Sequence, residues 1–290
     1  MSLFAYMFRR NVGRVDRARD AAIPLPEGVA SLLDISYGPY GKWNRTDIYF
    51  PEGTVHPLPT IVSIHGGGYV YGTKEIYRRY GMDMAKRGFA FVNFNYRLAP
   101  KWHFPTPLAD VNAVMQWVQK NAARYHLDPQ RLFLVGDSAG AQIASQYAAI
   151  ATNASYAAHF DFEVPDITIK GLGLNCGLYD AAALAAGKRK SIAKDYLGTK
   201  IPDTDPRLQV LANITENYPA AHITTACCDF LRENARPMAE HLQSKGIRTV
   251  MNCYGKDSDQ KIGHVFHVNI GLPEAHKCND DQCSFFYSLL

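Results

Sequence analysis

Two glycine-rich motifs in this chain have the composition of a nucleophilic serine and its oxyanion site. The first reads His-Gly-Gly-Gly at 65–68 and follows the apolar run at 60–64. The second reads Gly-Asp-Ser-Ala-Gly at 136–140 and follows the apolar run at 131–135. A lone G-x-S-x-G motif arises by chance in on the order of a tenth of chains of this length, but the pair is far rarer. Together the motifs predict acyl transfer, because that chemistry needs both a nucleophile and donors for an oxyanion.

Ser138 is the expected nucleophile. Gly136 and Gly140 flank it, at positions where a Cβ atom would clash with a tight turn and with a helix packed closely on a strand. A helix that begins at Ala139 would direct its free N–H groups and the positive end of its dipole toward the serine. The alternative is an ordinary tight turn, which the strand pattern before the motif and the helix pattern after it disfavour.

The N–H groups of Gly66, Gly67 and Ala139 are the expected oxyanion donors, because glycine lets the backbone approach a ligand closely. A phosphate cradle is disfavoured, since neither G-K-[ST] nor G-x-G-x-x-G occurs in the chain. His65 is expected to fix the loop by a hydrogen bond and to take no part in catalysis.

A serine hydroxyl needs a base, and the base needs an orienting carboxylate. When the nucleophile lies on such a strand-to-helix turn, the chain order is serine, acid and then histidine. His264 is the expected base, because it follows the strand that ends at Tyr254 by ten residues. His267 is the competing candidate.

Asp229 is the expected acid, because it lies at the carboxyl end of the strand predicted over 222–227. Glu233 is the alternative, although a carboxylate there also suits the start of the next helix. Asp229 could itself cap that helix. Asp257 and Asp259 are nearer to the histidine in sequence and have the character of a solvated loop.

Apolar and turn patterns predict alternating strands and helices around these residues. Strands are expected as two segments within 31–50, and at 59–64, 89–95, 131–135, 169–175, 222–227 and 248–254. Helices are expected near 108–118, 139–151, 234–245 and after 273. This alternation implies parallel crossovers, so the expected fold class is α/β, with a mostly parallel central sheet flanked by helices.

The N-terminal segment predicts a helix with one apolar face, ended by prolines at 24 and 26. That face would consist of Phe4, Phe8, Val12, Val15, Ala18 and Ala22. Every charged residue of the segment except Arg19 would lie away from its centre. The helix is expected to cap the substrate pocket, and the alternative is a helix that lies on a membrane surface.

A second cap element is expected between 178 and 219, where no strand pattern occurs. Such an insertion would lie at the carboxyl edge of the sheet, where ligands bind in open α/β sheets. The chain has no internal repeat and no low-complexity linker, so 1–290 is expected to form one domain with a small helical cap at about 1–30 and 178–219.

Composition limits the classes of partner. The net charge is +4, and five arginines against Asp16 and Asp20 put +3 of it within 1–20. The rest of the chain is nearly neutral, which argues against nucleic acid as a binding partner. No apolar run reaches the ~20 residues of a membrane span, and we expect no secretory signal. The six cysteines show no paired framework or zinc spacing, so we expect a cytoplasmic protein without metal or cofactor.

Residues 59–290 resemble the hormone-sensitive-lipase-like family of α/β-hydrolases, which includes many bacterial carboxylesterases. The shared pieces are the motifs at 65–68 and 136–140, Tyr-Arg-Leu-Ala-Pro at 96–100 with Phe-Pro at 104–105, Asp-x-Leu-Arg-Glu at 229–233, and His-x-Phe at 264–266. The resemblance implies a triad of Ser138, Asp229 and His264 beneath a helical cap. The family usually has glycine where Val265 stands.

The expected function is therefore a serine carboxylesterase that acts on a small ester through an acyl-enzyme. Tyr69 and Tyr71, with the aromatic segment at 96–102, are expected to bound the substrate pocket and restrict it to short acyl chains. The alternatives are a ligand-binding protein without turnover and a lipase or peptidase on the same fold. A homodimer is compatible with this reading.

Overall fold

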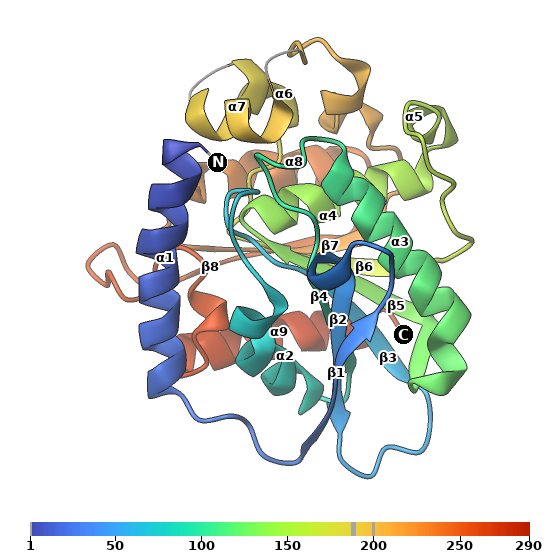
Figure 1. Cartoon of the computed structure of the whole chain (residues 1–290), viewed down its shortest axis with the longest axis vertical. Coiled ribbons are helices and arrows are strands. Elements are labelled where there is room, and N and C mark those ends of the chain that lie inside the picture. The colour runs from blue at the N-terminus through green and yellow to red at the C-terminus, as the bar shows by residue number, and fades with distance from the viewer. Residues whose placement is uncertain (1, 187–189, 199–200) are drawn as a thin grey trace.

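A computed structural model describes residues 2–186, 190–198 and 201–290. Its eight-stranded sheet has the order β1-β2-β4-β3-β5-β6-β7-β8 (Figure 1). The strands are β1 (Val29–Ser36), β2 (Arg45–Pro51), β3 (Leu58–Ile64), β4 (Ala90–Phe94), β5 (Leu127–Asp137), β6 (Ile169–Asn175), β7 (Ala220–Ala226) and β8 (Thr249–Tyr254). Pairing is antiparallel at β1–β2 and β2–β4 and parallel elsewhere. The predicted α/β architecture with a mostly parallel sheet is confirmed.

Helices cover both faces of this sheet (Figure 1). They are α1 (Leu3–Ala22), α2 (Arg78–Ala85), α3 (Thr106–Asn121), α4 (Ala139–Thr152), α5 (Ala154–Ala157), α6 (Ala181–Ala186), α7 (Lys190–Leu197), α8 (Ala235–Ser244) and α9 (Pro273–Tyr287). Helices α3, α4 and α8 pack on one face, and α2 and α9 pack on the other. The central strands are therefore buried on both sides, which is why they read as apolar runs rather than as alternating patterns.

The short helix α2 was not expected from the sequence. Its interior contains Gly81, which lowers intrinsic helix propensity. A methyl group on Gly81 would lie 2.8 Å from both the Phe91 and the Tyr49 ring. The glycine thus lets α2 pack closely on β4 and β2, and this tertiary packing compensates for the weak local signal.

The N-terminal helix exists as predicted, but its inward face is rotated from the predicted one. Ala5 and Gly13 are buried, whereas Val15 is 68% exposed. The expectation that the charges avoid the inner face is wrong for Arg9, which donates to the carbonyls of Val70 and Ala99. The small residues Ala5 and Gly13 let the helix pack closely on the body of the protein. The loop carbonyls at this contact need a hydrogen-bond donor, which Arg9 supplies and an apolar residue could not.

The predicted insertion between 178 and 219 contains α6, α7 and short 3₁₀ turns, and no strand occurs in its described residues. Residues 187–189 and 199–200 of the insertion lie outside the described part of the chain. In Figure 1, α6 and α7 lie above the sheet at its carboxyl edge, and α7 contacts α1. Among the described helices, none is long and apolar enough to cross a membrane.

Candidate active site

Ser138 lies in the sharp turn between β5 and α4. Its backbone has φ 53° and ψ −116°, a region that residues with a side chain rarely adopt. The Ser138 N–H donates to the carbonyl of Asn175 at 2.9 Å, which ties the turn to β6. Methyl groups on Gly136 and Gly140 would lie 2.3 Å and 2.1 Å from backbone oxygens. Both glycines are therefore required for the turn, as the sequence predicts.

His264 connects Ser138 to Asp229 by two hydrogen bonds. The distance from Ser138 Oγ to His264 Nε2 is 3.0 Å, and that from His264 Nδ1 to Asp229 Oδ1 is 2.7 Å. When Nδ1 carries the proton and donates it to the carboxylate, Nε2 is free to accept the serine proton. Residues 138, 229 and 264 are thus in the arrangement that activates a serine hydroxyl.

The carboxylate of Asp229 is fixed by several further donors. Asp229 accepts the Leu231 N–H at 2.8 Å and the Thr225 hydroxyl at 3.1 Å. Burial raises the pKa of Asp229, but the hydrogen bond and charge of His264 outweigh it, so the pKa lies below the ordinary value. Asp229 is therefore ionised at neutral pH and held in one orientation.

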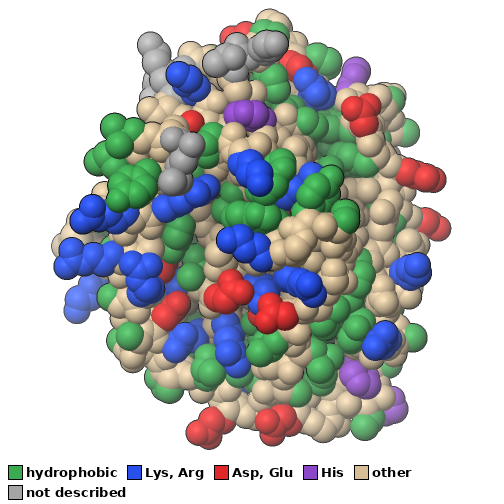
Figure 2. Space-filling model, in the orientation of Figure 1, with side chains coloured by type: hydrophobic (Ala, Val, Ile, Leu, Met, Phe, Trp, Pro, Cys, Tyr) green, Lys and Arg blue, Asp and Glu red, His purple; other side chains and the backbone are tan. Residues whose placement is uncertain are grey.

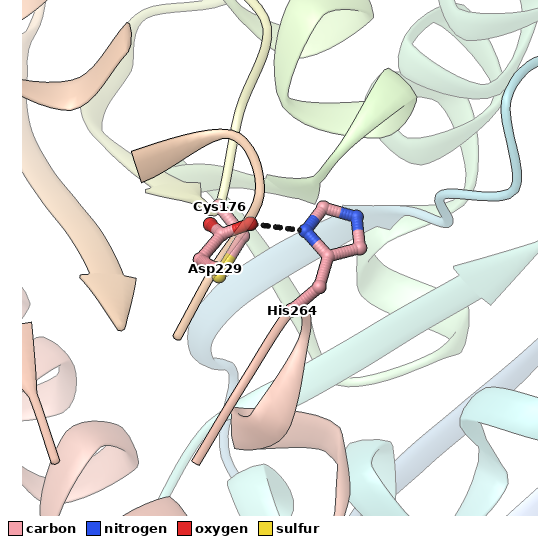
Figure 3. Close-up of side chains that lie close together, drawn as sticks. All are labelled: Cys176, Asp229 and His264. Carbon is pink, nitrogen blue, oxygen red and sulfur yellow. Dashed lines mark hydrogen bonds and ion pairs between the residues drawn. The ribbon is translucent and has the colours of Figure 1, made fainter. Parts of the chain in front are cut away.

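Figure 3 shows the thiol of Cys176 beside the Asp229 carboxylate and the His264 ring. One ligand atom of each of these three residues lies within 4.8 Å of the others. Both His264 nitrogens and Asp229 Oδ1 already bond within the serine–histidine–aspartate chain, and Asp229 Oδ2 accepts the Thr225 hydroxyl. We therefore assign no metal to this cluster.

The competing acids lie in other surroundings. The Glu233 side chain is 91% exposed and pairs with Arg232, which also pairs with Asp257. The histidine is bonded to Asp229 and to neither of these carboxylates. The geometry therefore favours Asp229 over Glu233.

The competing histidine is buried beside the base. His267 is 1% exposed, and neither of its ring nitrogens has a partner in the described part of the chain. Burial lowers the pKa of His267 to about 3, so its ring is neutral. Its ring meets that of Tyr80 edge to face, with centroids 5.3 Å apart. His267 is thus a packing residue.

Val265 has φ 61° and ψ 27°, the left-handed region, in the turn that carries His264. This conformation is strained for a β-branched residue and free for glycine. The Val265 N–H points to the sulfur of Cys176 at 3.4 Å. The turn therefore has the backbone shape that glycine would supply, even though valine occupies it.

Gly66 is not available as an oxyanion donor, and that prediction is wrong. Its N–H donates to the hydroxyl of Tyr77 at 3.0 Å. That hydroxyl donates in turn to Asp137 Oδ2 at 2.8 Å. Sequence reasoning missed Tyr77, because nothing in the local pattern connects it to the glycine loop.

The next two glycines retain free N–H groups. Within the described residues, the N–H groups of Gly67 and Gly68 donate no hydrogen bond. Both have positive φ, 114° and 58°, which favours glycine. Ala139 is the first residue of α4, so its N–H has no intrahelical acceptor. These three N–H groups are among the unbonded donors of the serine turn and the glycine loop in the described part of the chain.

The predicted pocket residue Tyr69 is instead part of the core. Tyr69 is 1% exposed, its ring stacks on Tyr196 of α7 at 3.7 Å, and its hydroxyl donates to Gln142. The expected direct contact of Tyr69 with substrate does not fit this burial. Tyr71 is partly exposed, and its hydroxyl donates to Asp16 of α1 at 2.8 Å.

A cavity of about 550 Å³ lies next to the base. Its lining comprises Leu178, Ala183, Leu184, Ala186, Phe230, Leu231 and Asn234. The Phe230 ring lies 4.1 Å from the ring of His264, measured between centroids. The cavity therefore has one wall against the histidine and another in the insertion, a size and composition suited to a small apolar ligand.

Comparison with known proteins agrees with this geometry. A family model described as alpha/beta hydrolase fold matches residues 61–267. Ethyl acetate hydrolase of Pseudomonas putida is 28% identical over a segment that covers 64% of this chain and 61% of that protein. Carboxylesterase NlhH of Mycobacterium tuberculosis is 27% identical over 80% of this chain and 77% of its own length.

Solved structures have the same fold. The inhibited esterase B of Lactobacillus rhamnosis superposes with a TM-score of 0.90 at 21% identity, covering 98% of this chain and 95% of that one. The esterase of Pyrobaculum calidifontis gives a TM-score of 0.80 at 21% identity, covering 100% of this chain and 92% of that one. At such low identity these likenesses show the arrangement of the backbone.

Proposed function

Because this chain belongs to the alpha/beta-hydrolase family, we propose that it is a serine carboxylesterase that hydrolyses short-acyl esters through an acyl-enzyme intermediate. The observation that carries the proposal is the hydrogen-bonded chain from Ser138 through His264 to Asp229. The names of the relatives, an ethyl acetate hydrolase and a carboxylesterase, support the same reaction.

In the first half-reaction, Ser138 Oγ attacks the ester carbonyl carbon while His264 Nε2 accepts the hydroxyl proton. Asp229 holds the Nδ1 proton and stabilises the imidazolium that forms. The carbonyl electron pair moves to the oxygen, and the resulting oxyanion accepts hydrogen bonds from the N–H groups of Gly67, Gly68 and Ala139. Collapse of this intermediate expels the alcohol, which takes its proton from His264.

In the second half-reaction, water attacks the acyl group on Ser138 and gives a proton to His264. The intermediate collapses to the carboxylic acid, and the proton returns to Ser138 Oγ. The same backbone donors stabilise the second oxyanion. No cofactor enters either step, since the ester bond supplies its own leaving group.

The substrate pocket is the cavity beside His264, which α6 helps to line, and the N-terminal helix α1 extends the cap over the glycine loop. The Phe8 ring of α1 would lie 3.5 Å from a methyl group on Gly68, so the helix packs on the loop that carries the oxyanion donors. Tyr71 joins this wall through its bond to α1. A compact cap over a cavity of about 550 Å³ favours short acyl groups, from acetyl to hexanoyl.

A series of aryl esters from acetate to decanoate tests the proposal. We expect kcat/KM to peak between acetate and hexanoate and to fall at least about tenfold by decanoate, because methylenes beyond the cavity gain no burial and clash with the cap. Ser138→Ala should abolish turnover, and Ser244→Ala on the exposed end of α8 is the matched control. A peak at decanoate, or activation by an oil–water interface, would indicate a lipase. Binding of esters without turnover would indicate a ligand-binding protein.

Two further properties belong to this proposal. All six cysteines are free, which supports a reducing compartment, the cytoplasm. A homodimer is the expected assembly if the chain associates, and light scattering of the purified chain would measure it. A monomer at all concentrations would refute the dimer and leave the esterase proposal intact.

A further inference from the structure

The outer face of α1 carries a stripe of exposed side chains that the fold does not use. Leu3, Met7, Arg10, Arg14 and Arg17 follow at steps of four and three, so they share one face of the helix. Leu3 is 74% exposed and Met7 is 51% exposed. Figure 2 shows Lys and Arg side chains gathered at the left edge of the molecule, where α1 lies in Figure 1.

The acidic residues of the helix are turned toward the body instead. Arg19 pairs with Asp16 at 3.1 Å and with Asp20 at 2.8 Å. Asp16 also accepts the hydroxyl of Tyr71, and Arg19 donates to the carbonyl of Ile76. The inner face is therefore internally compensated, and the outer face keeps a charge of +3 from its arginines.

The three outer arginines have no ion-pair partner within the described chain. Like charges three and four residues apart on a helix destabilise it. The charge of Arg17 acts on Asp16, but Arg10 and Arg14 pair with no acid of the described chain, so the repulsion among the three arginines works against helix stability. An external anionic surface would compensate these charges.

From this segregation we propose that the outer face of α1 docks the protein on an anionic lipid surface. Leu3, Tyr6 and Met7 enter the headgroup region with their apolar side chains. Tyr6 is 50% exposed beside the other two. Arg10, Arg14 and Arg17 bind lipid phosphates and carboxylates. Two weak signals, apolar and basic, are the combination that gives stable but reversible membrane binding.

A lipid surface fits better than the other anionic partners. A nucleic acid would neutralise the arginines but leave the apolar end of the stripe without a role. A second copy of this chain would set the same +3 stripe against itself if it packed by twofold symmetry. On the opposite side of α1, Phe8 packs against Gly68. Docking would therefore hold the proposed oxyanion loop about one helix diameter, ~10 Å, from the lipid.

Flotation of the full chain with lipid vesicles tests the proposal and does not depend on turnover. We expect binding to vesicles that contain about one third phosphatidylserine in phosphatidylcholine and at least tenfold weaker binding to phosphatidylcholine alone. Raising NaCl from about 0.05 M to about 0.5 M should release the protein, because salt screens exposed charges. Binding by Ser138→Ala should equal that of the wild type, which separates docking from the proposed esterase activity.

The triple variant Arg10→Gln, Arg14→Gln, Arg17→Gln should bind anionic vesicles about a hundredfold more weakly, at roughly fivefold per arginine. The matched control is Lys86→Gln, Arg236→Gln, Lys245→Gln, which removes the same charge from exposed sites on other elements. Its binding should stay within a few-fold of the wild type. Both triples should keep wild-type ester hydrolysis in lipid-free buffer, and the outer-face triple should not lower the melting temperature, because it removes repulsion between like charges.

Several results would overturn the proposal. Equal binding to neutral and anionic vesicles, or an equal loss in both triple variants, would remove the role of the stripe. A DNA duplex that binds more tightly than vesicles, in an arginine-dependent manner, would assign the face to nucleic acid. Dimerisation lost in the outer-face triple would assign it to a second copy.

Discussion

The hydroxyl of Tyr77 lies 2.8 Å from Asp137 Oδ2. The same hydroxyl oxygen accepts the Gly66 N–H at 3.0 Å. Tyr77 therefore links the residue beside the nucleophile to the loop that carries the proposed oxyanion donors. All three groups are buried, so this link is shielded from water.

Removing the Tyr77 hydroxyl should weaken catalysis. In Tyr77→Phe, the Gly66 N–H and the Asp137 carboxyl lose the hydroxyl that bonds them both. The glycine loop is then no longer held in position relative to Ser138. We expect kcat to fall roughly 10–100-fold and the unfolding free energy to fall by about 1–3 kcal/mol. The control is Tyr80→Phe, since the buried Tyr80 hydroxyl has no partner in the described chain. Equal effects of both substitutions on kcat would contradict the proposed link.

The acid assignment predicts different outcomes for two neighbouring carboxylates. Asp229→Asn should lower kcat by about 10⁴, because the imidazole then loses the group that fixes its tautomer. Glu233→Gln should keep most of the activity, since its exposed side chain pairs only with Arg232. Steady-state rates of both variants on one aryl ester decide the matter. If the two variants are equally impaired, the acid is unassigned.

Substitution of the two nearby histidines should affect different properties. Loss of His264 should lower kcat, and loss of His267 should lower the unfolding free energy. His264→Ala should lower kcat by on the order of 10⁴–10⁶ with the stability maintained. His267→Ala should retain activity per folded molecule and lose roughly 1–3 kcal/mol of unfolding free energy, because it opens a cavity in the core. Urea unfolding and steady-state rates measure the two properties. An inactive, stable His267→Ala beside an active His264→Ala would reverse the assignment.

Asp137 should make the stability depend on pH in the opposite sense to an ordinary salt-bridged carboxylate. Burial raises the pKa of Asp137 to about 7, although the hydrogen bonds of Tyr77 and Gly66 lower it in part. The unfolded value is near 3.9. Between these values the folded state binds a proton that the unfolded state lacks, so its contribution falls as pH rises from about 4 to 7.

The expected size of this loss is about 4 kcal/mol across the window. Asp137→Asn removes the titrating group, so the wild type should lose stability relative to the variant as pH rises. Urea unfolding of both proteins at about pH 4 and about pH 8 measures the difference. A difference that does not change with pH would show that Asp137 titrates in its ordinary range.

The sequence predicted those parts of the molecule that depend on local pattern and chain order. The α/β-hydrolase fold and the family are confirmed, and Ser138 lies on the predicted turn. A turn of this shape requires glycine at positions 136 and 140, so the motif can be recognised in the sequence. The order of serine, acid and histidine led to Asp229 and His264, and the structure brings these two side chains together with the serine.

The errors concern contacts between distant segments. The Gly66 N–H is occupied because the side chain of Tyr77 reaches the loop from the start of α2. Tyr69 is buried because Tyr196 of α7 stacks on it. The inward face of α1 depends on loop carbonyls that bind Arg9. None of these relations leaves a periodic pattern in the sequence.

Covalent trapping of the nucleophile tests the central claim most directly. An aryl ester of a short alkylphosphonic acid mimics the tetrahedral intermediate and should release one phenol per protein chain, forming a stable bond to Ser138 Oγ. Peptide mass spectrometry should find the alkylphosphonyl group on Ser138 in the wild type, with no adduct in Ser138→Ala and a much slower reaction in His264→Ala. A stoichiometric adduct at another residue, or one formed equally fast by Ser138→Ala, would contradict the account.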